Sequence, residues 1–168
     1  GAALLFNIKL PINFNSPYKA LDIQDFWRRW HITLSRFLKD YIYIPLGGNR
    51  KGSLMTYTNL LATFILGGIW HGAGWTFIFW GTLNGFYLVF ERLTAGVRKK
   101  LETITRIDKF PLFNKFIKVI ITFFLICYAW IFFRAKNLDD AFLISINMLR
   151  GWKGLFQNMF NFPFIKKV

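Results

Sequence analysis

Two histidines are the side chains of this 168-residue chain that titrate near neutral pH, and both lie in apolar surroundings. His71 is the single ionisable residue of the glycine-rich stretch 67–74, which separates the apolar runs 54–66 and 75–90. An ionisable side chain between apolar segments of this kind indicates a functional site. A histidine there can act as a general base that takes a proton from a hydroxyl, a step that contributes about 10²–10⁴ in rate.

A buried histidine is more often structural than catalytic, so both interpretations stay open for each histidine. Two features favour chemistry at His71: the flanking glycines leave the edge of the imidazole accessible, and no acid lies nearby to form an ion pair. His31 projects onto the apolar side of a predicted helix, beside Trp27, Leu34 and Leu38. That position favours neither role.

Several other kinds of site are not found in the sequence. The acids fall in loops or on polar helix faces, which gives no carboxylate pair of the glycosidase type, and no GxSxG motif or P-loop occurs. Two histidines alone make a poor zinc site, so we expect neither a bound metal nor a bound cofactor. Cys127 is the single cysteine, which excludes an intramolecular disulfide. It lies in an apolar run, where a small hydrophobic side chain is the simplest interpretation.

The composition indicates a membrane protein. Hydrophobic residues make up 54% of the chain and aromatic residues 20%, including 21 Phe. The net charge of +14 would suggest nucleic-acid binding in a soluble protein. Here, however, the basic residues form blocks between apolar runs, as they do in the cytoplasmic loops of membrane proteins. We therefore expect contact with membrane lipid and no nucleic-acid partner.

Residues 22–44 are predicted to form one amphipathic helix that lies at the membrane interface. Asp22 followed by Asp25 resembles a capping box and places the first turn near residue 23. When residues are placed about 100° apart, the charged side chains fall on one side and the aromatic and aliphatic ones on the other. Asp25 and Arg29 have the spacing of a helical ion pair. Pro45 and the glycines after it end the helix.

Residues 54–92 are predicted to form a membrane hairpin. Its first run measures about 15 residues, short for a full crossing as a helix, whereas the stretch 72–90 is long enough to span. The glycines between the two runs are expected to break the backbone, which at membrane depth is tolerated only where protein or water surrounds it. Basic blocks flank both ends of the hairpin, so both ends are predicted to face the cytoplasm. His71 then lies near the opposite tip and lines a cavity.

Small and polar residues inside the hairpin indicate contacts between helices. Gly68 and Gly72 have the GxxxG spacing, as do Gly81 and Gly85, and this spacing predicts a close approach of neighbouring helices. Asn84 is expected to make an interhelical hydrogen bond, with a place along the substrate path as the alternative. The same two roles, packing or substrate path, are open for the tryptophans near the histidines, which are Trp27, Trp30 and Trp70.

The rest of the chain continues the membrane pattern. Residues 92–115 are predicted to be a basic cytoplasmic loop, residues 116–134 a transmembrane helix, and residues 139–149 a short helix. The first residues lack the features of a signal peptide, and we expect the chain to be a piece of a longer protein. The predicted fold class is all-α. We expect residues 1–168 to form a single membrane domain, a fragment of a polytopic protein with about 3–4 membrane-embedded helices and the interfacial helix.

Five separated stretches form a recognisable pattern. They read NFNSPY from residue 13, DFWRRWHITLSRFLKDY from residue 25, YIPLGGNR from residue 43, GGIWHGA from residue 67 and AWIFFRA from residue 129. The pattern resembles the bacterial membrane-bound O-acyltransferase family, in the branch whose members O-acetylate alginate and peptidoglycan. The resemblance extends over nearly the whole chain and corresponds to the C-terminal portion of the family's larger members.

The resemblance implies a multi-pass fold in the bacterial inner membrane, with acyl donor and acceptor arriving from opposite faces. It implies that His71 is catalytic and that His31 is a second site residue. It also implies that a cytoplasmic thioester such as acetyl-CoA supplies the acyl group as a substrate. An extracytoplasmic partner protein would then help to pass this group to a polysaccharide.

Two other classes of function are the alternatives. A non-catalytic transport or scaffold module in the membrane would use both histidines as structural residues. A peripheral protein held on anionic lipid or nucleic acid by its basic blocks is disfavoured by the uninterrupted apolar runs.

Overall fold

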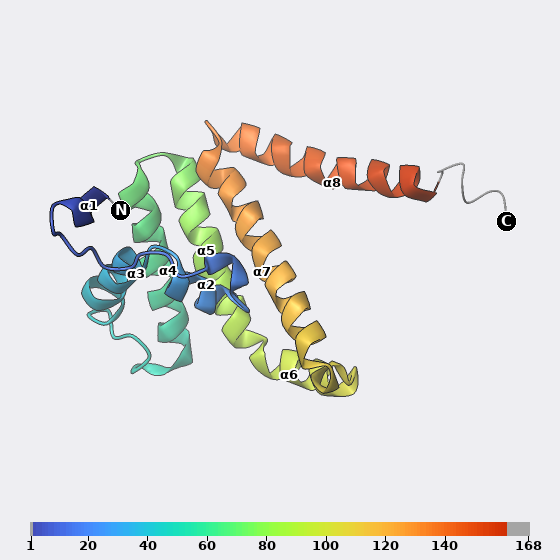
Figure 1. The fold of residues 1–168 in the computed structure, drawn as a ribbon, viewed down its shortest axis with the longest axis horizontal. Helices are drawn as coiled ribbons and strands as arrows, with labels where there is room; N and C mark the ends of the chain where they lie inside the picture. The colour runs from blue at the N-terminus through green and yellow to red at the C-terminus, as the bar shows by residue number, and fades with distance from the viewer. Residues whose placement is uncertain (1, 161–168) are drawn as a thin grey trace.

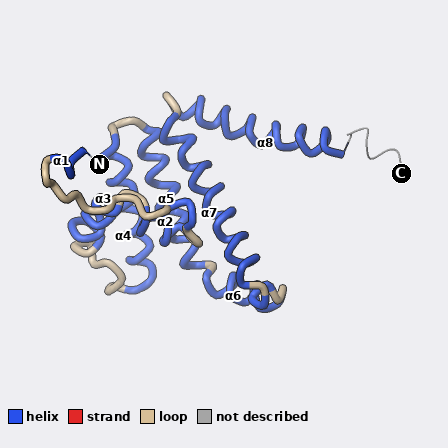
Figure 2. Tube along the Cα trace, viewed as in Figure 1, coloured by secondary structure: helices blue, strands red, loops and turns tan. Residues whose placement is uncertain are grey.

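The computed structural model describes residues 2–160, and this part of the chain consists of helices joined by turns and loops, without a strand (Figure 2). Three long helices lie side by side and carry the core, namely α4 (Gly52–His71), α5 (Trp75–Leu93) and α7 (Pro111–Arg134) (Figure 1). The all-α prediction is confirmed.

Two of these helices, α4 with 20 residues and α7 with 24, are long and apolar enough to cross a membrane. Helix α5 packs against both of them. Only 33% of the apolar window of α4 and 22% of that of α7 is buried. Most of their apolar surface therefore faces outward, as expected for helices that meet lipid or further membrane helices.

The hairpin differs from its prediction at the glycines. Helix α4 continues through Gly67 and Gly68 as far as His71, and the helical backbone is interrupted only at residues 72–74. The predicted backbone break is thus confirmed at residues 72–74 but not at Gly67 and Gly68, and the prediction of a short first helix is wrong. Isolated glycines lower helix propensity, but packing against a second helix outweighs that cost of roughly 1 kcal/mol each.

Helices α4 and α5 pack against each other through a close backbone contact at their glycines. A Cβ atom built on Gly81 would lie 2.3 Å from the carbonyl oxygen of Phe64, and one built on Gly68 would lie 2.3 Å from that of Phe77. Gly85 is also close, with the Cα of Leu61 3.2 Å from a Cβ built on it. The predicted close approach is confirmed for Gly68, Gly81 and Gly85. At Gly72, which follows the end of α4, an added Cβ would meet the ring of Phe77 and not the backbone of α5.

The single helix predicted over residues 22–44 is wrong. The chain instead forms α2 (Ile23–Arg29), α3 (Ile32–Leu38) and a π-helical turn, η2 (Lys39–Tyr43). The break falls at His31, whose φ of 44° lies in the left-handed region. The sequence has no proline or glycine at this point, so the helical periodicity gave no sign of the interruption.

The start of α2 follows its prediction. The backbone N–H of Asp25 donates to Oδ1 of Asp22 at 2.6 Å, and the N–H of Leu21 donates to Oδ2 of Asp25 at 3.2 Å. Asp25 also pairs with Arg29 at 2.8 Å. The N-cap bond of the predicted capping box and the ion pair are thus both present, while the returning bond to Asp25 comes from Leu21 and not from the N-cap residue Asp22.

The segment predicted as a basic loop over residues 92–115 is mostly helical. It contains α6 (Ala95–Ile104), the short 3₁₀ turn η3 (Ile107–Lys109) and the first residues of α7, which starts at Pro111 rather than at residue 116. Lys118 pairs with Glu102 at 2.9 Å and joins α7 to α6. The hydrogen bond from Lys118, and then that from Asn114, hold the pKa of the Glu102 carboxyl below its ordinary value.

Helix α8 (Leu138–Phe160) leaves the end of α7 and extends away from the three long helices (Figure 1). It begins close to the predicted start, where the side chain of Asn137 accepts a hydrogen bond from the N–H of Asp140 at 2.7 Å. The helix continues past residue 149, so the predicted end is wrong. Residues 161–168 of the tail lie outside the described residues.

Replacing Gly81 by Ala is expected to destabilise the hairpin by about 1–3 kcal/mol, because the added methyl group meets a carbonyl oxygen of the facing helix. Thermal unfolding of the full-length protein in detergent measures the effect. Gly96→Ala is the matched control, since a Cβ at Gly96 in α6 meets nothing within 4 Å. Equal melting temperatures for the two variants would contradict the backbone contact.

Candidate active site

His71 is the last residue of α4, and aromatic rings surround its half-buried imidazole. The ring centroids of Trp70, Phe133 and Trp80 lie 4.9, 5.1 and 5.3 Å from that of His71, each in an edge contact. Phe77 is stacked at 6.4 Å. Because Trp80 belongs to α5 and Phe133 to α7, residues far apart in the sequence meet at this histidine.

The turn at residues 72–74 shapes this environment. A Cβ atom built on Gly72 would lie 2.6 Å from Cε2 of Phe77, so the absence of a side chain lets that ring approach the end of α4. The N–H of Phe77 donates to the carbonyl oxygen of Gly74 at 3.1 Å and starts α5 directly after the turn. His71 therefore lies at the junction where α4 ends and the turn into α5 begins.

His31 lies at the break between α2 and α3. Its left-handed backbone conformation costs a residue with a side chain about 1–2 kcal/mol. Its imidazole packs against Phe14 with the centroids 6.1 Å apart, and its Nδ1 is buried without a hydrogen-bond partner in residues 2–160. The helical projection used for the sequence does not apply, because the helix stops here.

The loop before α2 holds this break by hydrogen bonds on both sides. The N–H of Asn15 donates to the carbonyl oxygen of Arg29 at 2.9 Å, and the N–H of Ile32 donates to that of Asn13 at 3.0 Å. The side-chain Oδ1 of Asn13 accepts two further bonds from Thr33, from N–H at 2.9 Å and from Oγ1 at 2.8 Å. These contacts offset the cost of the left-handed conformation and orient His31.

A carboxylate from the far end of α5 fixes the start of α2. Oε1 of Glu91 accepts from the N–H of Ile23 at 3.3 Å, and Oε2 accepts from that of Gln24 at 3.2 Å. The first N–H groups of a helix lack partners within the helix, so an acceptor placed there stabilises it. Nothing in the sequence around Glu91 indicated this role, because its partners lie 67 and 68 residues away.

The tryptophans singled out in the sequence have different surroundings. Trp70 is 61% exposed and touches His71 directly. Trp27 meets the ring of Trp80 at 5.8 Å and so reaches His71 through it. Trp30 instead stacks on Phe26 at 5.6 Å, in a cluster that has no ring contact with His71 within the described residues.

Asn84 is almost fully buried, with 1% of its surface exposed. Its Nδ2 donates to the carbonyl oxygen of Trp80 in the same helix at 2.8 Å, and its Oδ1 has no partner in residues 2–160. The interhelical hydrogen bond expected from the sequence is therefore not formed in this part of the chain.

A cavity of about 450 Å³ opens among α2, α3, α4 and the end of α5. Trp27 and Phe64 contribute apolar surface, and four basic side chains line the cavity, from Arg28, Arg36, Lys39 and Arg92. No acidic residue is among those that line it in the described chain. Such a cavity favours an anionic group, and guanidinium groups suit phosphate in particular. The sequence indicated a basic face but not this cavity, because the helix break that shapes it was not predicted.

This arrangement defines a helical protein of membrane type, with a histidine at the turn of a hairpin and a basic cavity beside it. Residues 2–135 match the family described as MBOAT, membrane-bound O-acyltransferase family, and the chain belongs to that family. The resemblance predicted from the motifs is thus confirmed.

Named relatives support the same assignment. The chain is 56% identical over 155 residues to a peptidoglycan O-acetyltransferase of Helicobacter pylori, a match that covers 92% of this chain and 27% of the relative. It is 45% identical over 141 residues to the probable alginate O-acetylase AlgI of Azotobacter vinelandii, covering 84% and 26%. A teichoic acid D-alanyltransferase of Streptococcus thermophilus is 36% identical over 103 residues, covering 57% and 24%. The chain therefore spans about a quarter of the length of these relatives.

Replacing Asn13 by Ala is expected to loosen the backbone around His31, because Thr33 loses its side-chain acceptor. The amide of Thr33 should exchange with solvent about 10-fold faster, which corresponds to a loss of about 1.4 kcal/mol. Hydrogen exchange followed by mass spectrometry on peptides that cover residues 30–36 measures the change.

Asn13→Asp, which keeps the acceptor oxygen, should exchange like the parent protein. Asn15→Ala is the matched control, because the hydrogen bonds of Asn15 described here come from its backbone. Faster exchange in Asn15→Ala than in Asn13→Ala would contradict the role of the Asn13 side chain.

Proposed function

We propose that this chain is the part of a bacterial inner-membrane O-acyltransferase that carries the catalytic base. The enzyme transfers an acetyl group from a cytoplasmic thioester donor to hydroxyls of an extracytoplasmic polysaccharide. Family membership supports acyl transfer, and the names of the relatives support peptidoglycan or alginate as the kind of acceptor. The observation that carries the proposal is the position of His71, which is half-buried at the end of α4 and is contacted by residues of α5 and α7.

The reaction begins at the imidazole of His71. The described residues give neither histidine an ion-pair partner, so a lone pair of the imidazole is free to accept the proton of the attacking hydroxyl. The hydroxyl oxygen forms a bond to the thioester carbonyl carbon, the carbon–sulfur bond breaks, and the leaving thiolate takes up the proton. His31, at the backbone break between α2 and α3, is the second residue of the proposed site.

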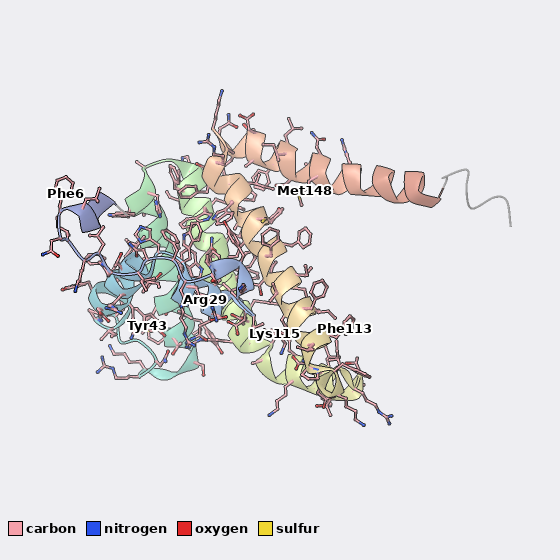
Figure 3. The ribbon with its side chains drawn as sticks, viewed as in Figure 1. Phe6, Arg29, Tyr43, Phe113, Lys115 and Met148 are labelled. Atoms are coloured by element: carbon pink, nitrogen blue, oxygen red, sulfur yellow. The ribbon has the colours of Figure 1, made fainter. Side chains whose placement is uncertain are left out.

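The distribution of charge supports the proposed orientation. The basic residues of α6 and Lys115 lie at one end of the long helices, and the turn that follows His71 lies at the other end (Figures 1 and 3). Basic segments prefer the cytoplasm, so the His71 turn lies toward the extracytoplasmic side of a multi-pass protein. A polysaccharide, and a partner protein that hands on the acyl group, would approach from that side.

The basic cavity is the proposed entry for the donor. Acetyl-CoA carries several phosphate charges on one end and the thioester on the other, which matches basic side chains at the cavity and an apolar wall beyond them. Trp27 lines the cavity and touches Trp80, whose ring touches His71. The donor is a substrate here and not a resident cofactor.

Replacing His71 by Ala in the full-length protein is expected to abolish O-acetylation of the cell-envelope polymer, since loss of a general base costs about 10²–10⁴ in rate. Ester-bound acetate on the isolated polymer measures the effect, and immunoblotting of membranes shows that the variant is still inserted. Normal acetylation by His71→Ala would rule out His71 as the general base. If the variant instead lowered the amount of protein in the membrane, this would support the scaffold alternative.

Replacing Arg36 by Ala is expected to raise the KM for acetyl-CoA about 10-fold, because a charge-assisted hydrogen bond to phosphate is worth about 1.5–3 kcal/mol. Initial rates against donor concentration in membranes that contain the full-length protein give this value. Lys99→Ala removes an exposed charge of α6 outside the cavity and should leave the KM unchanged. Equal effects of the two variants would show general charge attraction and not a donor site.

A further inference from the structure

Two buried indole N–H groups have no hydrogen-bond partner in the described part of the chain. One belongs to Trp80, whose ring touches that of His71, and the other to Trp27, whose ring touches that of Trp80. Trp80 is only 6% exposed. Buried polar groups in native proteins nearly always have a partner, and in a membrane the cost of leaving one unpaired is higher still. These two groups therefore need an acceptor that the described residues do not provide.

The positions of the two rings suggest what that acceptor is. The ring of Trp80 stands nearly perpendicular to that of His71, at 88° with the centroids 5.3 Å apart. Trp27 meets Trp80 at 5.8 Å and also lines the basic cavity. A donor that reaches from the cavity toward His71 would meet the indole of Trp27 first and that of Trp80 last.

Packing alone does not account for indoles at these positions. The same cluster contains phenylalanines that make edge contacts of similar length, such as Phe133 with Trp80 at 5.0 Å and Phe64 with Trp27 at 5.1 Å. A phenylalanine provides such a contact without bringing a polar N–H into an apolar interior. What distinguishes the indole is its ability to donate a hydrogen bond.

We infer that Nε1 of Trp80 donates a hydrogen bond to the thioester carbonyl oxygen of the acyl donor, and that Nε1 of Trp27 binds a more distant carbonyl of the same donor. The inference rests on the proposed function. A donor aimed at the carbonyl oxygen stabilises the negative charge that develops there during attack, which is how preorganised donors lower the barrier of acyl transfer.

The reaction then proceeds with all atoms accounted for. As the hydroxyl oxygen bonds to the carbonyl carbon, the carbonyl electron pair moves onto the carbonyl oxygen and His71 accepts the hydroxyl proton. The N–H of Trp80 stabilises the negative charge on that oxygen by a hydrogen bond. The pair returns to re-form the carbonyl, the carbon–sulfur bond breaks, and the thiolate receives the proton from His71. Trp80 keeps its proton throughout.

The test is Trp80→Phe in the full-length protein, assayed in membranes with acetyl-CoA as the donor and the polymer of the same cells as the acceptor. We expect kcat to fall about 10²-fold with the KM for acetyl-CoA nearly unchanged. Trp27→Phe should instead raise that KM with little change in kcat. Trp130→Phe is the matched control, because Trp130 packs on Trp30 and has no ring contact with His71 or Trp80 within the described residues, and it should leave both constants unchanged.

A second variant at position 80 tests the contribution of the N–H group independently of the shape of the ring. Benzothienylalanine at position 80 has a ring system of nearly the same size, with sulfur in place of the N–H, and should show the same loss of kcat. Full activity of either variant at position 80 would overturn the inference, since it would leave the indole a packing role. Loss of folded protein would also overturn it, because the partner of the N–H would then be another part of the polypeptide.

The outcome is independent of the test of the base. If His71→Ala is inactive while Trp80→Phe is fully active, the proposed function stands and only this inference fails. If His71→Ala is active while Trp80→Phe is impaired, the assignment of His71 as the base is wrong and the hydrogen bond from Trp80 to the carbonyl stands.

Discussion

The backbone contact between Gly68 and Gly81 is the constraint on which the arrangement of the site depends. Inside a membrane the hydrophobic effect does not drive helices together, so close van der Waals contact between small residues contributes much of the association. Here each glycine leaves room for a carbonyl oxygen of the opposite helix. This contact fixes how α4 and α5 are rotated and shifted relative to each other. A shift of one residue would turn either helix by about 100° and take Trp80 away from His71.

The short helices α2 and α3 are attached to this hairpin by contacts of two kinds. Aromatic contacts from Trp27 join α2 to both arms of the hairpin, through Phe64 and Trp80. Polar contacts act at the ends, where Glu91 holds the first turn of α2 and the loop around Asn13 holds the break before α3. Because the backbone bends at His31, the basic residues after it can line a cavity together with Trp27. In a continuous helix these basic residues would lie too far from Trp27 to line the same cavity.

The parts of the structure that could be predicted from the sequence are those that depend on neighbours in the chain. The hairpin and the helix after it follow from apolar runs, the N-cap of α2 from Asp22, and the close approach of helices from the spacing of Gly81 and Gly85. What the sequence did not show depends on residues far away along the chain. The break at His31 is held by Asn13 and Asn15, and the aromatic surroundings of His71 come from three helices. Local periodicity carries no information on such contacts.

The contact between Glu91 and the start of α2 has a consequence for biogenesis. Glu91 accepts from residues that leave the ribosome 67 and 68 positions earlier. At synthesis rates of about 5–20 residues per second, α2 waits roughly 3–14 s for this carboxylate. During that time both arms of the hairpin are made and can enter the lipid. The hydrogen bonds that fix the first turn of α2 can therefore form only after both arms of the hairpin have been synthesised.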